Sequence, residues 1–285
     1  MNGTALALVL VAAVVHAAWN LVAKRVRAGA RFVFLYYSVS AAVLLPVVAV
    51  SLVTTDARPQ WTWLLAAAVT AVCHVCYGVV LQRGYAVGDL SVVYPLARGS
   101  GPLLSVLAAV LVLGERPGAL GLAGALLVVA GVLLISGRPS GADRRARRAG
   151  IGYGLLTGAT IAAYTLWDAY SVTTLSVPPV VYFGTGALLQ SLLLAPYALR
   201  GGQTRALWRD HRKEVVLVGV LSPVAYLLVL FAMRMAPVSL VAPARELSIV
   251  LGSLAGWWLL GEADPVRRIT GSLVVVAGIT AIALA

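Results

Sequence analysis

Charged side chains are scarce in this chain of 285 residues. Asp, Glu, Lys and Arg make up 11% of it, whereas a soluble domain contains about 25%. Hydrophobic residues make up 61%, against about 45–50% in soluble proteins. So few polar residues could not cover a fold of this size in water, and the composition therefore excludes a water-soluble enzyme and a disordered chain.

Signatures of hydrolysis and of ATP use are also absent. The sequence has no P-loop and no H-E-x-x-H motif, and the Gly-Ser-Gly of 99–101 lacks the preceding glycine of an intramembrane protease. Cys73 and Cys76 enclose His74 in a C-x-x-C stretch, but no second ligand pair accompanies it, so we expect neither a metal nor a cofactor. We expect His74 to be hydrogen-bonded or to line a cavity.

Long apolar runs are what the sequence has instead. About 17–25 apolar residues cross the hydrocarbon of a bilayer, and ten stretches have this length. Because lipid cannot satisfy open backbone groups, these spans are predicted to be helices of an all-α polytopic membrane protein. The predicted spans are 5–23, 32–54, 61–82, 90–113, 118–136, 150–173, 179–199, 215–233, 237–260 and 268–284.

The basic residues predict the orientation of these spans. Of 22 Lys and Arg residues, 17 lie in loops after odd-numbered spans, and only Arg58, Arg116 and Arg234 lie in loops on the other side. The positive-inside rule therefore predicts a multi-pass protein of the cytoplasmic (inner) membrane with both termini outside. The net charge of +12 then reflects topology, so we expect the lipid bilayer as a partner and no nucleic acid.

The two halves of the sequence repeat each other. The Trp-Asn pair at 19–20 corresponds to Trp-Asp at 167–168, an offset of 148 residues, and 91–95 corresponds to 239–243 at the same offset. Five spans per half is an odd number, so the second copy must be inverted relative to the first. Inverted repeats permit alternating access; a duplication kept only for helix packing is the alternative.

The predicted organisation follows from this repeat. It consists of a first five-helix repeat at 1–137, a basic cytoplasmic linker at 138–149 and a second, inverted five-helix repeat at 150–285.

Further motifs mark a resemblance to a known family. Leu-Gly-Glu closes the fourth span at 113–115 and the ninth at 260–262, and a glycine-rich span follows each. The His-Ala-Ala-Trp-Asn of 16–20, followed by Lys24, is similar to one subgroup of that family. The whole chain resembles the EamA-like ten-helix members of the drug/metabolite transporter (DMT) superfamily. The resemblance implies a secondary transporter with a central cavity, and it favours export of a metabolite.

Four ionisable residues lie inside predicted spans: Arg98, Asp168, Arg245 and Glu246. Each costs about 2.5–3.5 kcal/mol at the bilayer centre, so a partner or a wet cavity must compensate it. We interpret Arg98 and Arg245 as groups that attract a substrate carboxylate or phosphate, with a structural ion pair as the alternative. Glu246 directly follows Arg245, so we expect it to point about 100° away and to pair with a different helix.

Prolines accompany both arginines. Pro95 and Pro243 precede Arg98 and Arg245, and bends at matching positions of two halves point to a binding site. Tyr94, beside Pro95, is counted among the substrate-binding residues. At the helix ends, Glu115 and Glu262 are expected to be structural and to hold neighbouring loop amides.

Two polar and aromatic helix faces complete the predicted site. Each has the spacing i, i+3, i+4, so its three residues project from one side of a helix. We expect the two faces to converge near the centre and to bind substrate; packing of each tryptophan between helices is the alternative. The members are His16, Trp19 and Asn20 in the first span and Tyr164, Trp167 and Asp168 in the sixth.

Asp168, His16 and Glu246 are the candidates for proton coupling. A carboxylate in a poorly hydrated cavity can exchange a proton near neutral pH, and an imidazole changes charge in the physiological range. A permanent salt bridge from Asp168 to Arg98 or Arg245 is the alternative, and the sequence leaves it open.

The sequence thus predicts a secondary active transporter, a monomer or a homodimer, for a small polar or zwitterionic, amino-acid-like metabolite. Protons or exchange would drive it. The alternatives from other classes are a membrane-embedded lipid-modifying enzyme and a passive facilitator. The enzyme would need a polar cluster at the bilayer surface, whereas these charges lie within the spans.

Overall fold

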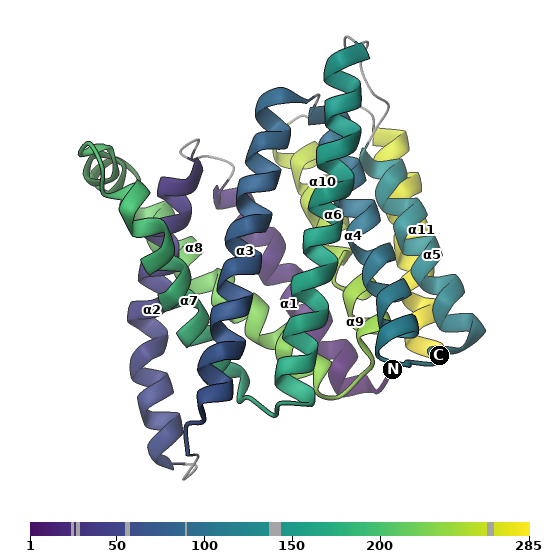
Figure 1. The fold of residues 1–285 in the computed structure, drawn as a ribbon. Coiled ribbons are helices and arrows are strands. Elements are labelled where there is room, and N and C mark those ends of the chain that lie inside the picture. Colours follow the sequence, from purple (N-terminus) through teal and green to yellow (C-terminus); the bar gives the residue numbers. More distant parts are fainter. Residues whose placement is uncertain (24–25, 27–28, 55–57, 89, 137–143, 261–264) are drawn as a thin grey trace.

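The computed structural model describes residues 1–23, 26, 29–54, 58–88, 90–136, 144–260 and 265–285. Every regular element within them is a helix, as predicted. The helices run side by side, and their connections lie at the two ends of the bundle (Figure 1). They are α1 (Gly3–Ala23), α2 (Gly29–Thr54), α3 (Trp61–Val87), α4 (Leu90–Val112), α5 (Gly118–Ser136), α6 (Arg144–Thr173), α7 (Pro179–Ala198), α8 (Gln203–Met233), α9 (Val238–Ala244), α10 (Leu247–Leu260) and α11 (Pro265–Leu284).

The chain crosses the bundle ten times. Nine segments of the described chain are long and apolar enough to cross a membrane, and one of these is formed by α9 together with α10. α6 supplies the remaining crossing and packs extensively on α4. An even number of crossings brings both termini to the same end, where Figure 1 shows them close together.

Two helices begin earlier than the apolar pattern predicts. α6 starts at Arg144 rather than at 150, and α8 starts at Gln203 rather than at 215. Helical hydrogen bonding does not require apolar residues, so basic segments extend both helices beyond the hydrocarbon. α8 leaves helical geometry at His211 (φ −128°, ψ 28°), where its polar first part joins the apolar part.

The predicted linker at 138–149 is therefore partly helical, because its residues 144–149 belong to α6. Residues 137–143 lie outside the described residues, as do Lys24 and Glu262.

The two halves are interleaved rather than separate. α1 packs on α8, α2 on α7, α4 on α6 and α5 on α11, so each of these pairs joins the halves. The pattern has two-fold symmetry: α4 on α6 corresponds to α1 on α9 and α10, and α1 on α8 corresponds to α3 on α6. The fold is thus two inverted five-helix repeats around one shared core.

Glycines allow the closest of these contacts. A Cβ on Gly124 of α5 would lie 2.6 Å from the Gly278 carbonyl oxygen of α11, and one on Gly131 would lie 2.7 Å from that of Gly271. The backbones of α5 and α11 therefore touch directly, as small residues permit in membranes. Gly154 of α6 allows close packing on α4 in the same way, since a Cβ there would lie 2.7 Å from Leu96. Gly252 of α10 differs from these glycines, because a Cβ there would meet no atom within 4 Å.

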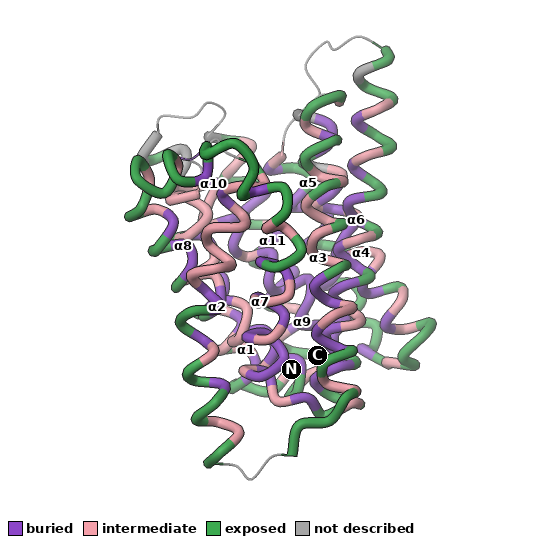
Figure 2. Tube along the Cα trace, turned by 60° about the vertical axis from the view of Figure 1, so that its left-hand side comes forward, coloured by how far each residue is buried: buried purple, intermediate pink, exposed green. Residues whose placement is uncertain are grey.

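Burial follows the pattern of a protein surrounded by lipid. Buried residues follow the inner sides of the helices, and exposed ones lie on the outer sides and at the ends (Figure 2). Large apolar residues such as Leu111 (81%) and Trp258 (80%) are among the most exposed. An outer surface of this kind is suited to hydrocarbon and not to water.

Candidate functional site

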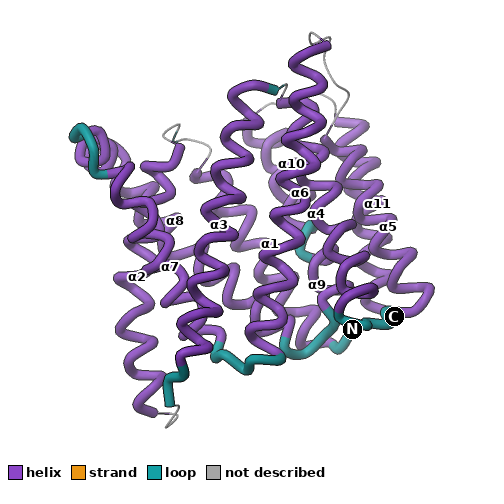
Figure 3. The backbone as a smooth tube through the Cα atoms, in the orientation of Figure 1, coloured by secondary structure: helices purple, strands orange, loops and turns teal. Residues whose placement is uncertain are grey.

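The ninth crossing is broken in the middle of the bundle. Pro243 has no backbone N–H, so it cannot donate the helical hydrogen bond to Ser239. Between α9 and α10, Arg245 and Glu246 form a tight turn in which the Glu246 N–H donates to the Pro243 carbonyl at 3.0 Å. Figure 3 shows this short loop inside the bundle. The bend predicted near Pro243 is confirmed, whereas α4 is one continuous helix through Pro95.

Three charged side chains meet at this break. Arg98 Nη1 of α4 lies 3.8 Å from Glu246 Oε2, and Arg245 Nε lies 3.9 Å from Glu246 Oε1. Glu246 pairs with a different helix, as predicted. The prediction that it points away from Arg245 is wrong, because the helix is interrupted between them and the 100° rule for neighbouring residues does not apply.

The three charges leave one positive charge uncompensated within the cluster. The Glu246 side chain is 2% exposed, and its Oε2 accepts no hydrogen bond within the described residues. The Arg98 side chain retains 20% exposure, so it is less enclosed than Glu246, and its guanidinium has up to five N–H donors. Such a group can bind a carboxylate or a phosphate through two parallel hydrogen bonds.

Aromatic residues surround the arginines. The Tyr94 ring lies 5.9 Å from Arg98 Cζ, within the range of a cation–π contact. Tyr164 of α6 and Tyr77 of α3 meet edge to face with centroids 5.7 Å apart. Both tyrosines are close enough to Arg98 and Arg245 to interact with them electrostatically. Three helices (α3, α4 and α6) and the turn between α9 and α10 therefore contribute to one polar and aromatic centre.

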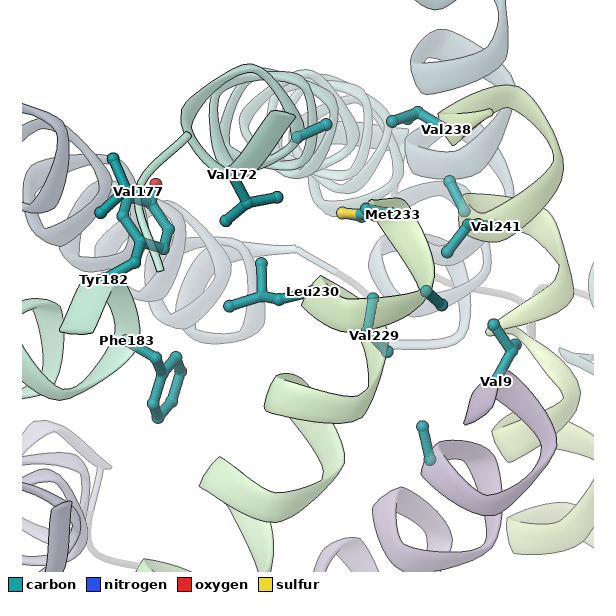
Figure 4. Close-up of a cluster of buried hydrophobic side chains, with 14 of the residues drawn as sticks. Val9, Val172, Val177, Tyr182, Phe183, Val229, Leu230, Met233, Val238 and Val241 are labelled. Carbon is teal, nitrogen blue, oxygen red and sulfur yellow. The ribbon is translucent and has the colours of Figure 1, made fainter. Parts of the chain in front are cut away.

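Asp168 is fully buried in a cage of hydroxyl groups. Its Oδ1 accepts hydrogen bonds from Thr70 of α3 and from Tyr182 of α7, both at 2.6 Å, and its Oδ2 accepts one from Tyr226 of α8. The ring of Tyr182 packs in an apolar cluster near Val177 (Figure 4). These partners are hydroxyls, so the alternative of a fixed ion pair with an arginine does not describe this carboxylate.

His74 adjoins this cage. Its Nδ1 lies 3.1 Å from the Thr70 hydroxyl and 3.0 Å from the Thr70 carbonyl oxygen. Its ring stacks on Tyr164, with centroids 4.2 Å apart, and meets the edge of Tyr226. The prediction of a hydrogen-bonded His74 is confirmed.

The predicted face of α1 is only partly directed to this centre. His16 and Trp19 form an edge-to-face pair with centroids 4.8 Å apart, and His16 is close enough to Arg98 for electrostatic interaction. Asn20 donates to the His16 carbonyl of its own helix at 2.8 Å. Trp19 packs against the cluster around Phe32 near the basic end of the bundle.

The expected convergence of the two tryptophans is wrong. Trp167 packs against a different cluster from Trp19, and its Nε1 donates to the Ala66 carbonyl at 3.0 Å. With a rise of about 1.5 Å per residue, Trp19 lies about 9 Å past the middle of α1 and Trp167 about 8 Å past the middle of its predicted span. Because the two helices run in opposite directions across the bundle, the two displacements move the Trp19 and Trp167 rings toward opposite ends of the bundle.

Thr70, Tyr77, Tyr182 and Tyr226 were missed by the sequence analysis. A signal was available in α3, where Thr70, His74 and Tyr77 have the spacing i, i+4, i+7 on one face of an apolar helix. No comparable pattern marks Tyr182, which lies in a largely apolar segment.

Glu115 fixes the start of the broken crossing. Its two carboxylate oxygens accept the backbone N–H groups of Val238 and Ser239, each at 2.8 Å, at the N-terminus of α9. A carboxylate there satisfies free amides and interacts favourably with the helix dipole. The predicted structural role of Glu115 is confirmed.

Fold and site together define a class: a polytopic α-helical membrane protein with two inverted halves and charged residues at a helix break inside the bundle. The model of the EamA-like transporter family matches the chain twice, over residues 3–137 and 148–284, and the chain belongs to this family of the DMT superfamily. It is therefore a transporter of small molecules and not an enzyme.

A solved structure titled "Crystal structure of protein" is similar to this chain. Its TM-score is 0.80 at 17% sequence identity, and the alignment covers 100% of this chain and 98% of that one. At this identity the similarity concerns the fold. No curated protein matches the sequence.

Proposed function

We propose that this protein is a secondary active transporter that moves a small polar or zwitterionic, amino-acid-like metabolite across the cytoplasmic membrane by alternating access. Export is favoured, and coupling to protons or exchange drives the cycle. The observation that carries this proposal is the partly exposed side chain of Arg98, which lies beside the break between α9 and α10 and exceeds the charge that Glu246 compensates. Broken helices near the bilayer midplane are where transporters of this architecture bind substrate.

The chemistry of the centre favours a carboxylate with an apolar or aromatic neighbour. Arg98 would bind the carboxylate, and Arg245 would keep the local potential positive. Tyr94 and Tyr164 would contact the apolar part, and His16 would contact a polar one. A substrate anion would compensate the one positive charge that remains when Glu246 is paired with the two arginines.

Asp168 is the proposed site of proton coupling. Its cage donates three hydrogen bonds to the carboxylate, and hydroxyls can rotate to accept a hydrogen bond from the protonated form. An arginine partner would instead hold the group permanently ionised. Asp168 therefore has surroundings that accommodate both protonation states.

The test is substrate-dependent proton movement in sealed proteoliposomes that contain a pH-sensitive dye. Purified protein is exposed to pooled amino acids, and wild type is compared with Asp168→Asn. Asp210→Asn is the matched control, because Asp210 is an exposed carboxylate paired with Arg209 in the polar part of α8. We expect proton movement in wild type and Asp210→Asn and its loss in Asp168→Asn.

Two other outcomes would contradict parts of the proposal. Saturable solute movement without protons would make the protein an exchanger or uniporter and would remove the coupling role of Asp168. Flux that follows concentration without saturation would indicate a passive facilitator.

A further inference from the structure

His74 is a titratable group inside the bundle to which the proposed function gives no part. The Thr70 carbonyl oxygen, 3.0 Å from Nδ1, can only accept a hydrogen bond. In the neutral ring this contact favours the tautomer with the proton on Nδ1 and the lone pair on Nε2. We take this tautomer as the starting state of the ring.

The Thr70 hydroxyl lies between His74 and Asp168. Its oxygen is 2.6 Å from Asp168 Oδ1 and 3.1 Å from His74 Nδ1. A hydroxyl has one proton to donate and two lone pairs that accept. Because the proton is donated to the carboxylate, the lone pairs face the Nδ1–H, and all donors along the three groups point toward Asp168.

We propose that His74 is the proton entry of the coupling site and passes the proton to Asp168 through the Thr70 hydroxyl. This inference rests on the proposed role of Asp168. A proton from water binds the His74 Nε2 lone pair, the Nδ1 proton moves to Thr70 Oγ1, and the Thr70 hydroxyl proton moves to Asp168 Oδ1. One proton enters and one carboxylate is neutralised, while His74 ends neutral with its proton on Nε2. The reverse sequence releases the proton.

The titratable groups around the relay are three tyrosines and one cysteine. Tyr164 of α6 stacks on His74, and Tyr226 of α8 contacts both His74 and Asp168. Tyr182 of α7 donates to the same Asp168 oxygen as Thr70, and Cys73 of α3 interacts electrostatically with Asp168.

The charged groups nearest to this region are those that interact with Tyr164. Arg98 and Arg245 interact electrostatically with its ring, and Tyr37 of α2 does so as well. His74 stacks on Tyr164, which belongs to the centre where the substrate is proposed to bind, so the relay extends from the buried carboxylate toward that centre. Thr70 and His74 are one turn apart, so the path rises about 6 Å along α3 toward that centre.

The inverted copy of these elements lacks the whole relay. If the relay were a by-product of packing shared by both halves, residues at the repeat offset of 148 would keep some of its hydrogen bonds. Instead the cage and the carboxylate, built by Thr70 of the first half and by residues of the second half, occur at only one of the two symmetry-related positions among the described residues, as a device for one coupled proton requires. The counterparts are Val218 for Thr70, Ser222 for His74, Phe34 for Tyr182, Gly78 for Tyr226 and Asn20 for Asp168.

The experiment follows protonation of Asp168 itself after a rapid drop in pH. Time-resolved infrared difference spectroscopy on the protein in lipid nanodiscs detects the carbonyl band of the protonated carboxyl. The only ligand added is the proton itself, supplied by the drop in pH. Asp168→Asn identifies the band. Thr70→Val and His74→Gln interrupt the relay, while Thr70→Ser keeps the hydroxyl.

Tyr182→Phe is the matched control, because it removes the other hydrogen bond to Asp168 Oδ1 and leaves the relay intact. Both Thr70→Val and Tyr182→Phe should shift the pH at which the Asp168 carbonyl band reaches half of its full intensity. We expect only Thr70→Val and His74→Gln to slow its appearance, by about tenfold or more, and Thr70→Ser to react like wild type.

The relay is wrong if Thr70→Val or His74→Gln protonates Asp168 at the wild-type rate, or if Tyr182→Phe is slowed as much as Thr70→Val. Either result leaves the proposed function standing, provided that Asp168→Asn still abolishes proton movement in proteoliposomes. Absence of an Asp168 band at every pH would overturn the relay and the coupling role of Asp168 together.

Discussion

Glu115 Oε1 accepts the backbone N–H of Val238 at 2.8 Å, so a carboxylate of the first half fixes the first turn of α9 in the second. α9 is only seven residues long and ends at the charged break. The position of Arg245 and Glu246 therefore depends on a contact two turns away, at the opposite end of α9.

Replacing Glu115 should loosen this helix. Glu115→Ala leaves two partly buried amides without an acceptor and should cost about 1–3 kcal/mol of stability. Glu115→Gln keeps one acceptor oxygen and should cost less. Thermal unfolding in detergent measures both, with Glu214→Gln as the control on a carboxylate near the polar end of α8. An unchanged midpoint in Glu115→Ala would show that these hydrogen bonds do not hold α9.

The charge cluster predicts strong coupling between Arg98 and Glu246. Glu246→Gln alone leaves two arginines without a carboxylate and should destabilise the protein by about 3–5 kcal/mol. In the double variant with Arg98→Gln the loss should be smaller than the sum of the single losses by about 1–3 kcal/mol. A double-mutant cycle of unfolding midpoints measures this term, and simple additivity would mean that the 3.8 Å pair contributes no interaction energy.

Two Gly→Ala substitutions should have opposite signs. Gly124→Ala places a methyl group 2.6 Å from the Gly278 carbonyl oxygen and must push α5 from α11, at a cost of about 1–3 kcal/mol. Gly252→Ala meets no atom within 4 Å and should stabilise α10 by up to about 1 kcal/mol. Thermal unfolding of the two variants compares them directly, and equal effects would contradict the backbone contact between α5 and α11.

The predicted orientation can be tested with single cysteines. In a background with Cys73→Ser and Cys76→Ser, Arg58→Cys and Arg147→Cys place exposed thiols at opposite ends of the bundle. The positive-inside rule predicts that an impermeant thiol reagent labels position 58 in intact cells and position 147 only after permeabilisation. The reverse pattern would place the termini in the cytoplasm.

The fold was predictable because it depends on signals carried by many residues. The number of crossings follows from hydropathy summed over about 20 residues each, and the inversion follows from an odd number of spans in each half. The N-terminal extension of α6 to Arg144 was not predictable from hydropathy, since the basic segment that forms it carries no apolar signal.

The site was predictable only where a single residue is costly. Arg98, Asp168, Arg245 and Glu246 stand out because each charge is expensive in lipid. Their partners do not stand out: Thr70, for example, is 98 residues from Asp168, and a hydroxyl on an apolar helix is common. Which hydroxyl meets which carboxylate depends on the rotation and depth of each helix, and these come from packing of the whole bundle.

The interleaving of the halves also has a consequence for biosynthesis. α1 can pack on its partner only after α8 has been synthesised, α2 only after α7, and α5 only after α11. Insertion of individual helices can proceed in chain order, whereas assembly of the bundle cannot finish before α11 has been inserted. Truncation after any helix from α5 to α10 should leave an inserted chain in which Gly124 and Gly131 of α5 have no partner helix, and such a chain is a substrate for membrane quality control.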